Sequence, residues 1–197
     1  MDKKILATIE IADHEVRLIV GQFYNGRLNI LKVERVPHEG IRNFKVVNSQ
    51  SVRQAILKSV TNASENIGGE ITRVLVCLPA FDLLVKSTVQ TIAINQYVTE
   101  QNLRTLYNKI TSEKVSGSHV LTTANITRFH VNGITTRKIP LNERTRELSA
   151  EADCYYIDKN VAFDYLKIIE QTGLEVLDVV IDDLGFAKEA SLFEKSI

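Results

Sequence analysis

The sequence has no excess of charge of one sign and no long apolar run, and these absences exclude two classes of protein. Lys and Arg total 24 residues, and Asp and Glu also total 24. Without net charge or a basic run, the sequence predicts no binding to nucleic acid. No segment approaches the ~20 apolar residues that a membrane-spanning helix needs. The first apolar run breaks at Glu10, too early for a signal peptide.

Cysteine is also scarce, which excludes a protein built on a disulfide framework. The two cysteines, Cys77 and Cys154, each lie inside an apolar run that is typical of a strand. This placement favours small buried hydrophobic side chains in a reducing compartment. We therefore expect a cytoplasmic protein.

The residues that are present predict an α/β pattern at the start of the chain. Apolar, β-branched runs at 4–12, 15–24 and 28–36 predict a three-stranded antiparallel meander, with Asp13 and His14 in its first turn. Apolar residues at helical spacing predict a helix over 49–68, with Ser51 and Gln54 as a capping box. An unbroken apolar run then predicts a buried strand over 74–78, which completes a βαβ crossover.

The middle of the chain has a different pattern, which predicts an inserted module. Strands are expected over 83–94, 120–131 and 148–157, with a short helix opening at Thr99. The α/β pattern then resumes with a helix, an apolar strand over 174–181 and a further helix from Leu184. We predict three parts: 1–80, an insertion over 81–157, and a return over 158–197.

Four short segments of the chain together point to a known family. They are Glu10-Ile11-Ala12-Asp13-His14 in the first hairpin, Gly40-Ile41-Arg42 before the first long helix, Ile67-Gly68-Gly69 before the Val-rich strand, and Thr172-Gly173-Leu174 before the last strand. In order and spacing they resemble the bacterial cell-division protein family FtsA, of the actin-like ATPase superfamily, which carries Asp-Ile-Gly-Thr/Ser-Ser at the first segment. The resemblance implies an actin-like (ribonuclease-H-like) α/β subdomain IA, α+β overall, with a small α+β insertion of the FtsA 1C type.

The first hairpin departs from the family pattern at its turn. In related ATPases this turn brings backbone N–H groups against phosphate, a close approach that favours Gly. Here Ala12 adds a methyl group, and Asp13 adds negative charge. Like charges ~4 Å apart cost about 4 kcal/mol at an effective dielectric of about 20. We therefore interpret Glu10, Ala12, Asp13 and His14 as a degenerate phosphate hairpin with weak or lost nucleotide binding. A solvated turn is the alternative.

The resemblance also implies partners, most of them outside this sequence. The family's second phosphate hairpin, its FtsZ-docking subdomain and its membrane-binding helix are expected beyond Ile197. We expect no cofactor for this chain alone; ATP and magnesium are implied for a full-length protein. Residues 81–157 are expected to recruit later division proteins, and actin-like contacts to support self-association. A full-length protein is expected at the cytoplasmic face of the membrane at the division site.

Two other functions share this fold and stay open at this point. One is half of an ATP-dependent kinase, and the other is an actin-like scaffold for pilus or secretion assembly. No set of residues predicts a catalytic centre, so we expect an adaptor rather than an enzyme. Each remaining candidate has a structural alternative. Phe129, Tyr155 and Tyr156 could bind a partner or could pack within the inserted module, and Asp182 and Asp183 could resemble a metal site or cap a helix. The histidines are interpreted as surface or strand residues: His14, His38, His119 and His130.

Overall fold

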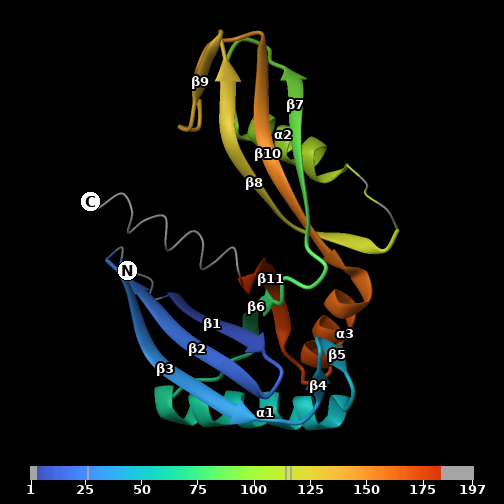
Figure 1. Cartoon of the computed structure of the whole chain (residues 1–197). Helices are drawn as coiled ribbons and strands as arrows, with labels where there is room; N and C mark the ends of the chain where they lie inside the picture. The colour runs from blue at the N-terminus through green and yellow to red at the C-terminus, as the bar shows by residue number, and fades with distance from the viewer. Residues whose placement is uncertain (1–3, 26, 114, 116, 183–197) are drawn as a thin grey trace, which may run out of the picture. The chain divides into compact units, whose positions relative to one another are not determined.

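The computed structural model describes residues 4–25, 27–113, 115 and 117–182. The chain divides into two compact units, shown in Figure 1. Unit 1 comprises Met1–Phe81 and Lys159–Ile197, and unit 2 comprises Asp82–Asp158. The assignment of these units to particular FtsA subdomains stays a prediction.

Unit 1 is built on a five-stranded mixed sheet with the order β11-β6-β1-β2-β3. The strands β1 (Lys4–Ile11), β2 (Glu15–Tyr24) and β3 (Arg27–Pro37) form the predicted antiparallel meander. The strands β6 (Arg73–Leu78) and β11 (Glu175–Ile181) continue the sheet in parallel with β1. The mixed α/β class predicted from the sequence is confirmed.

Two helices provide the crossovers between these strands. Helix α1 (Ser49–Ile67) packs on β2 and β3, and α3 (Lys159–Glu170) precedes β11. The helix begins at Ser49, as predicted, but the predicted capping box was wrong, because the N-cap is Asn48, whose side chain accepts from the Ser51 N–H. Gly68 ends α1 at a φ of 68°, the left-handed geometry that its sequence position indicated. A short hairpin of β4 (Ile41–Arg42) and β5 (Lys45–Val46) lies between β3 and α1, where the sequence predicted no strand.

Side-chain alternation gives the unit 1 sheet two different faces. The face toward α1 carries the buried residues Ile9, Leu18 and Val76, and α1 in turn buries Val52 and Ile56. Each fully buried side chain of this size contributes about 1.5–3 kcal/mol through its removal from water. The opposite face carries Glu10, Arg17, Arg35 and their neighbours, because these residues alternate with the core positions. This second face holds the candidate site.

Unit 2 is a four-stranded antiparallel sheet with one helix. Its strands β7 (Leu84–Ala93), β8 (His119–Val131), β9 (Ile134–Thr136) and β10 (Glu147–Asp158) have the order β7-β10-β8-β9. Helix α2 (Glu100–Thr111) begins with a capping box between Thr99 and Asn102. Its buried residues belong to a core with alternate residues of β10: Leu106, Ile110, Leu148, Ala150, Ala152, Cys154 and Tyr156. The sequence did not predict β9.

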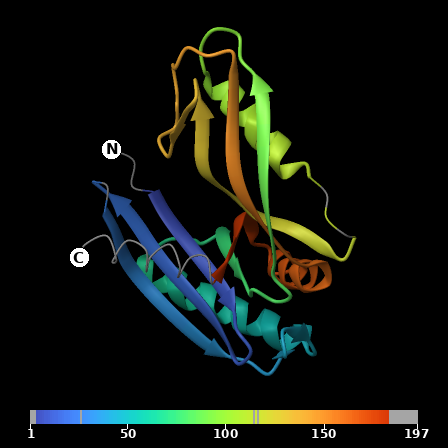
Figure 2. The same cartoon turned by 45° about the horizontal axis from the view of Figure 1, so that its top comes forward.

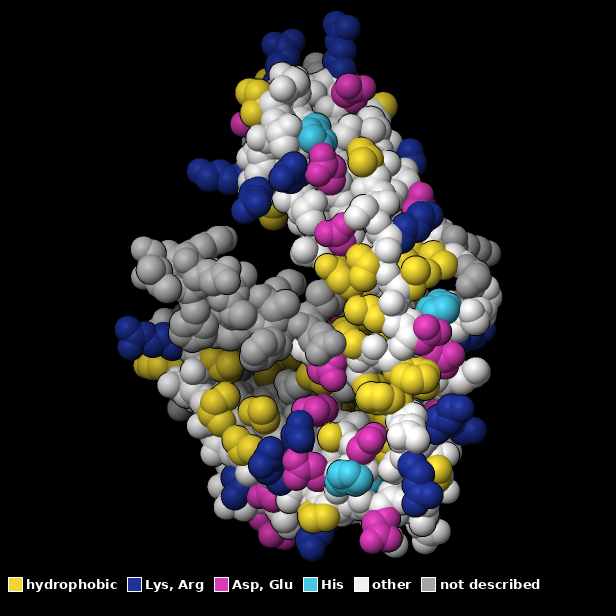
Figure 3. Space-filling model, in the orientation of Figure 1, with side chains coloured by type: hydrophobic (Ala, Val, Ile, Leu, Met, Phe, Trp, Pro, Cys, Tyr) yellow, Lys and Arg dark blue, Asp and Glu magenta, His cyan; other side chains and the backbone are white. Residues whose placement is uncertain are grey.

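Two further expectations concern segments rather than single residues. The helix expected from Leu184 lies outside the described residues. Within the described residues, no helix combines the length and apolar character needed to cross a membrane. On the face drawn in Figure 3, basic and acidic side chains are interspersed in both units, in keeping with the balanced composition.

Candidate functional site

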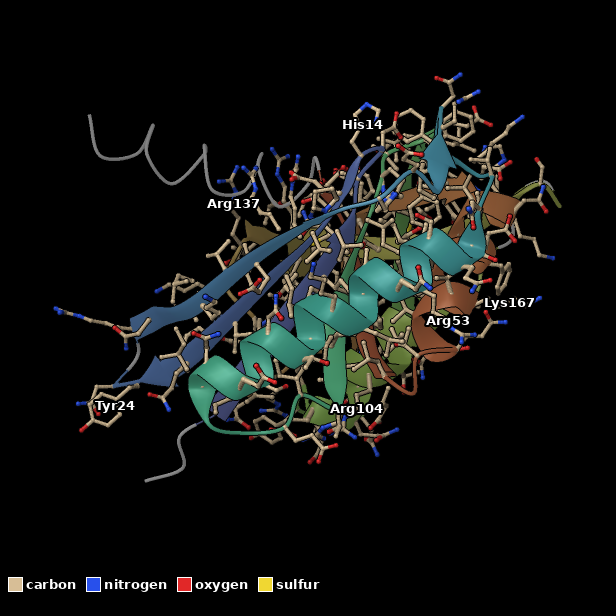
Figure 4. The ribbon with its side chains drawn as sticks, turned by 90° about the horizontal axis from the view of Figure 1, so that it is seen from below. His14, Tyr24, Arg53, Arg104, Arg137 and Lys167 are labelled. Carbon is tan, nitrogen blue, oxygen red and sulfur yellow. The ribbon has the colours of Figure 1, made fainter. Side chains whose placement is uncertain are left out.

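The turn between β1 and β2 is closed by its own backbone. The Ala12 N–H donates to the Glu15 carbonyl at 3.0 Å, and the His38 N–H donates to the His14 carbonyl at 2.9 Å. His14 is exposed and lies at the opposite end of β2 from Tyr24 (Figure 4). The first bond engages an N–H group at the position where the family carries glycine.

Behind the turn, four charged residues form an ion-pair ladder across the three antiparallel strands. Glu10 opposes Arg17, and Arg17 opposes Arg35, in the sheet register. Arg17 Nη1 lies 3.0 Å from Glu10 Oε1, and Arg17 Nε lies 2.7 Å from Glu15 Oε1. Arg35 Nη2 lies 3.4 Å from the same Glu15 oxygen. The hydrogen bond from Arg17 lowers the pKa of the Glu15 carboxyl, which is therefore ionised at neutral pH.

The turn rests on two buried side chains. His38 is buried, and its Nδ1 accepts from the Gly40 N–H at 3.1 Å. Burial lowers the pKa of His38, and the Ala12 backbone opposes that shift only in part, so the ring is neutral at physiological pH. Tyr165 of α3 is fully buried, and burial together with the negative charge of Asp13 raises its pKa. A neutral imidazole therefore lies against the turn, and a neutral phenol lies within reach of the charge of Asp13.

A hollow of about 360 Å³ lies beside the ladder on the same face of the sheet. Its lining is partly charged and partly apolar: Thr8, Glu10, Arg17, Ile19, Val33, Arg35 and Cys77. Burial, aided by the charges of Glu10 and Asp182, raises the pKa of the Cys77 thiol to about 11. The thiol is therefore protonated at neutral pH and is a poor nucleophile.

The structure brings Glu10, Ala12, Asp13 and His14 together at one hairpin, but the ladder residues were missed. Arg17 lies opposite Glu10 in the sheet, and Arg35 lies opposite Arg17. The alternation of side chains along β2 and β3 was the signal that could have placed both arginines on the face of Glu10. Among the described residues, no group of three or more His, Cys, Asp or Glu is placed to hold a metal ion. Both carboxylates of the ladder face arginine instead.

The other candidates are explained by packing and pairing within each unit. The interpretation of His38 as a surface or strand residue was wrong, because it is buried beneath the turn. His119 and His130 are strand residues, with Nε2 atoms 3.2 Å from Asp82 and 2.8 Å from Glu151. Phe129 and Tyr156 belong to the core under α2, whereas Tyr155 alternates to the opposite face of the sheet. Asp183 lies outside the described residues.

Strand order and crossovers together define a domain of the actin-like ATPase fold. Consistent with that class, a solved structure, the PilM-PilN type IV pilus biogenesis complex, superimposes with a TM-score of 0.59 at 10% identity. The superposition covers 90% of this chain and 47% of the other. At this identity the likeness concerns the fold alone. No protein-family model matches the sequence.

Sequence comparison identifies more specific relatives. The chain is 25% identical over 183 residues to the cell division protein FtsA of Enterococcus hirae, covering 91% of this chain and 41% of that protein. It is 21% identical over 195 residues to FtsA of Bacillus subtilis, covering 96% of this chain and 44% of that protein. The resemblance to FtsA predicted from the motifs is thus confirmed as a divergent one. The chain spans about two fifths of the length of these relatives.

Proposed function

We propose that this chain is part of an FtsA-like adaptor of the septal ring that works through protein partners rather than ATP turnover. The relatives named above are cell division proteins, which supports the process. We infer the absence of ATP turnover from one observation, the ion-pair ladder at the hairpin where the superfamily binds phosphate.

The ladder and the turn fit a magnesium-bound phosphate poorly for three reasons. The Glu10 carboxylate already pairs with Arg17, so a hydrated cation would have to displace a guanidinium. The Ala12 N–H is already bonded to the Glu15 carbonyl, and the Ala12 methyl group occupies the position where glycine permits close approach. Asp13 adds like charge at the turn. Nucleotide binding at this hairpin is therefore weak or lost.

A direct test is nucleotide-dependent stabilisation of a full-length protein, which carries the second phosphate hairpin that the resemblance implies, beside a variant with the family turn. The variant combines Glu10→Asp, Ala12→Gly, Asp13→Thr and His14→Ser, and Asp13→Asn alone serves as the matched control for charge. Because a ligand stabilises the folded state in proportion to ln(1 + [L]/Kd), the melting temperature with and without millimolar ATP and magnesium measures affinity. We expect no shift for the parent or for Asp13→Asn, and a larger shift for the four-residue variant. A parent shift equal to that of the variant would contradict the proposal and revive the kinase alternative.

The adaptor role assigns recruitment to unit 2. We propose that a full-length protein links FtsZ filaments to the cytoplasmic face of the membrane and that residues 82–158 contact later division proteins. In cells that depend on the protein, those residues would be replaced by a short flexible linker, with Arg17→Ala as the control in unit 1. We expect the linker variant to reach the FtsZ ring but to lose later division proteins, and the control to keep them. Normal recruitment by the linker variant would refute this assignment.

A further inference from the structure

The strand β7 presents an unusually open edge in unit 2. It is an end strand of the sheet, and of the residues that the structure describes only those of β10 pair with it along its length (Figure 2). Its ten residues, Leu84–Ala93, include no proline or glycine and are rich in β-branched side chains. Such edges are templates for pairing with another strand unless charges, bulges or covering elements block them.

Two hydrogen bonds show which backbone groups of β7 face outward. The Ile94 N–H donates to the Arg146 carbonyl at 2.8 Å, in continuation of the β7–β10 register. Because both backbone groups of one residue in an antiparallel strand point to the same side, even-numbered positions bond to β10 and odd-numbered positions face outward. In agreement, the Thr91 carbonyl accepts from Lys109 Nζ at 2.8 Å. Lys109 therefore blocks the outward edge at Thr91 and leaves Val85, Ser87 and Val89 open.

We propose that the β7 edge pairs with the β7 edge of a second copy of this chain, antiparallel and across a two-fold axis at Ser87. In this register Ser87 opposes Ser87 of the second copy, and Val85 opposes Val89. All of these positions are outward-facing, so both strands offer N–H and carbonyl groups at matching places. The valines are 48% and 61% exposed, and pairing covers them.

The residues on both faces select this register over its neighbours. Lys86 opposes Thr88, so no two like charges meet, and this removes a destabilising cross-strand contact. Thr91 opposes Leu83, which lies before the start of β7, so the Lys109 cap falls outside the paired stretch. A two-fold axis at Val89 would instead place Thr91 and its blocked carbonyl inside the ladder. The free stretch is thus centred on Ser87.

The interface is small, and the dimer is weak and dependent on concentration, since contacts below about 1,200 Å² belong to transient complexes. A pair of identical edges is also isologous, which closes the assembly at two copies. The contact lies in unit 2 and involves no residue of the β1–β2 hairpin. The inference therefore goes beyond the proposed adaptor function, and its failure would leave that function untouched.

Site-directed cross-linking of the whole chain tests the register. Opposed residues in a hydrogen-bonded antiparallel pair have Cα atoms about 5.5 Å apart, whereas two Val89 residues would lie about 14 Å apart along the strands, at ~3.4 Å per residue. A short bis-maleimide reagent should therefore link Ser87→Cys to itself and leave Val89→Cys monomeric. The parent chain controls for Cys77 and Cys154. Cross-linking of Val89→Cys but not of Ser87→Cys would overturn the proposed register.

A second variant tests the dimer without disturbing the ladder to β10. Val89→Pro removes an outward N–H, so the inner hydrogen bonds of β7 are kept. In sedimentation velocity we expect the parent to shift from monomer to dimer as its concentration rises, and Val89→Pro to stay monomeric with a normal melting profile. Val89→Ala, which keeps the N–H, should still dimerise. A parent that stays monomeric at every concentration would overturn the proposal. The same holds for a parent that stays monomeric but binds an extended peptide of another protein.

Discussion

Each of the two sheets of the molecule has one uncovered polar face, and the side chains on the two faces interact in different ways. In unit 1 the face turned away from α1 carries the charged ladder of Glu10, Arg17, Glu15 and Arg35. In unit 2 the corresponding face combines the pairs of Glu151 with Arg128 and His130 and neutral hydrogen bonds such as that between Thr91 and Ser149, at 2.8 Å. Ion pairs respond to salt, pH and charged ligands, whereas neutral hydrogen bonds respond little. The comparison predicts the stronger response in unit 1, where three ion pairs link four side chains of one hairpin region.

The largest expected effects come from the two cores. We expect Leu18→Ala in unit 1 and Leu148→Ala in unit 2 each to lower the free energy of unfolding by about 2–5 kcal/mol, because each removes a fully buried side chain. Hydrogen exchange read by mass spectrometry should show the loss of protection mainly in the unit that carries the change. Val89→Ala, at an exposed position, serves as the control. Equal loss in both units for either core variant would show that they unfold as one.

A glycine gives the next largest effect and is specific to unit 1. A Cβ atom on Gly40 would collide with Val52 and with the Asn48 carbonyl at the start of α1. We expect Gly40→Ala to cost about 1–3 kcal/mol, as is usual for overpacking. Gly69→Ala is the matched control, since a Cβ atom there meets nothing within 4 Å. Chemical denaturation of the two variants should separate them; equal midpoints would show that the β4–α1 junction yields easily.

Local patterns predicted most of the secondary structure, and long-range packing accounts for what they missed. The period-2 and helical spacings located the long strands and α1, and the Asn132-Gly133 turn adopts the left-handed φ values of 51° and 75° that its residues favour. The start of α1 was predicted at Ser49 and is confirmed, but its cap was misassigned, because local sequence leaves the choice between Asn48 and Ser51 undecided. Burial of His38 depends on tertiary packing beside the turn, where its N–H bonds to the His14 carbonyl, and no local pattern encodes that.

The same distinction applies to the candidate site. The hairpin residues were found because they are contiguous in sequence. Arg17 was missed because a cross-strand partner is defined only once the register of two strands is known. The predicted eroded chemistry at the turn stays a prediction, and the ladder adds the physical reason to expect it.

Acid titration should sharpen the contrast between the two ionic clusters at a smaller scale. The pKa of the Glu15 carboxyl lies below its ordinary value of 4.5 because Arg17 bonds to it, and Lys86 lowers the pKa of Glu113 in unit 2 in the same way. A lowered folded pKa means that the stabilisation is complete above about 4.5 and is lost as pH falls through the folded pKa. Urea unfolding of Arg17→Gln and Lys86→Gln at several pH values should show this window.

The expected difference between parent and variant is modest at pH 7, since all four side chains are partly exposed, and shrinks toward zero at low pH. Added salt should reduce it as well. Because Arg17 pairs with two carboxylates and Lys86 pairs with one, Arg17→Gln should lower the free energy of unfolding more than Lys86→Gln does. A difference that persists unchanged at acid pH would mean that packing of the arginine stem, rather than its charge, stabilises unit 1.

The smallest effect on the free energy of unfolding is expected for a neutral cross-strand hydrogen bond of unit 2. The hydroxyl groups of Thr91 and Ser149 lie 2.8 Å apart on an exposed cross-strand pair. Thr91→Val removes the hydroxyl and keeps the β-branched shape that a strand favours, so the loss should be about 0.5–1 kcal/mol at most. Because neither partner is charged, the effect should be the same at low and high salt and from pH 7 to pH 4. The denaturant midpoints of Thr91→Val and Arg17→Gln, measured at low and at high salt, test the contrast. Added salt should change the difference in midpoint from the parent only for the arginine variant. An equal salt response in both would mean that the two sheet faces do not differ as their side chains indicate.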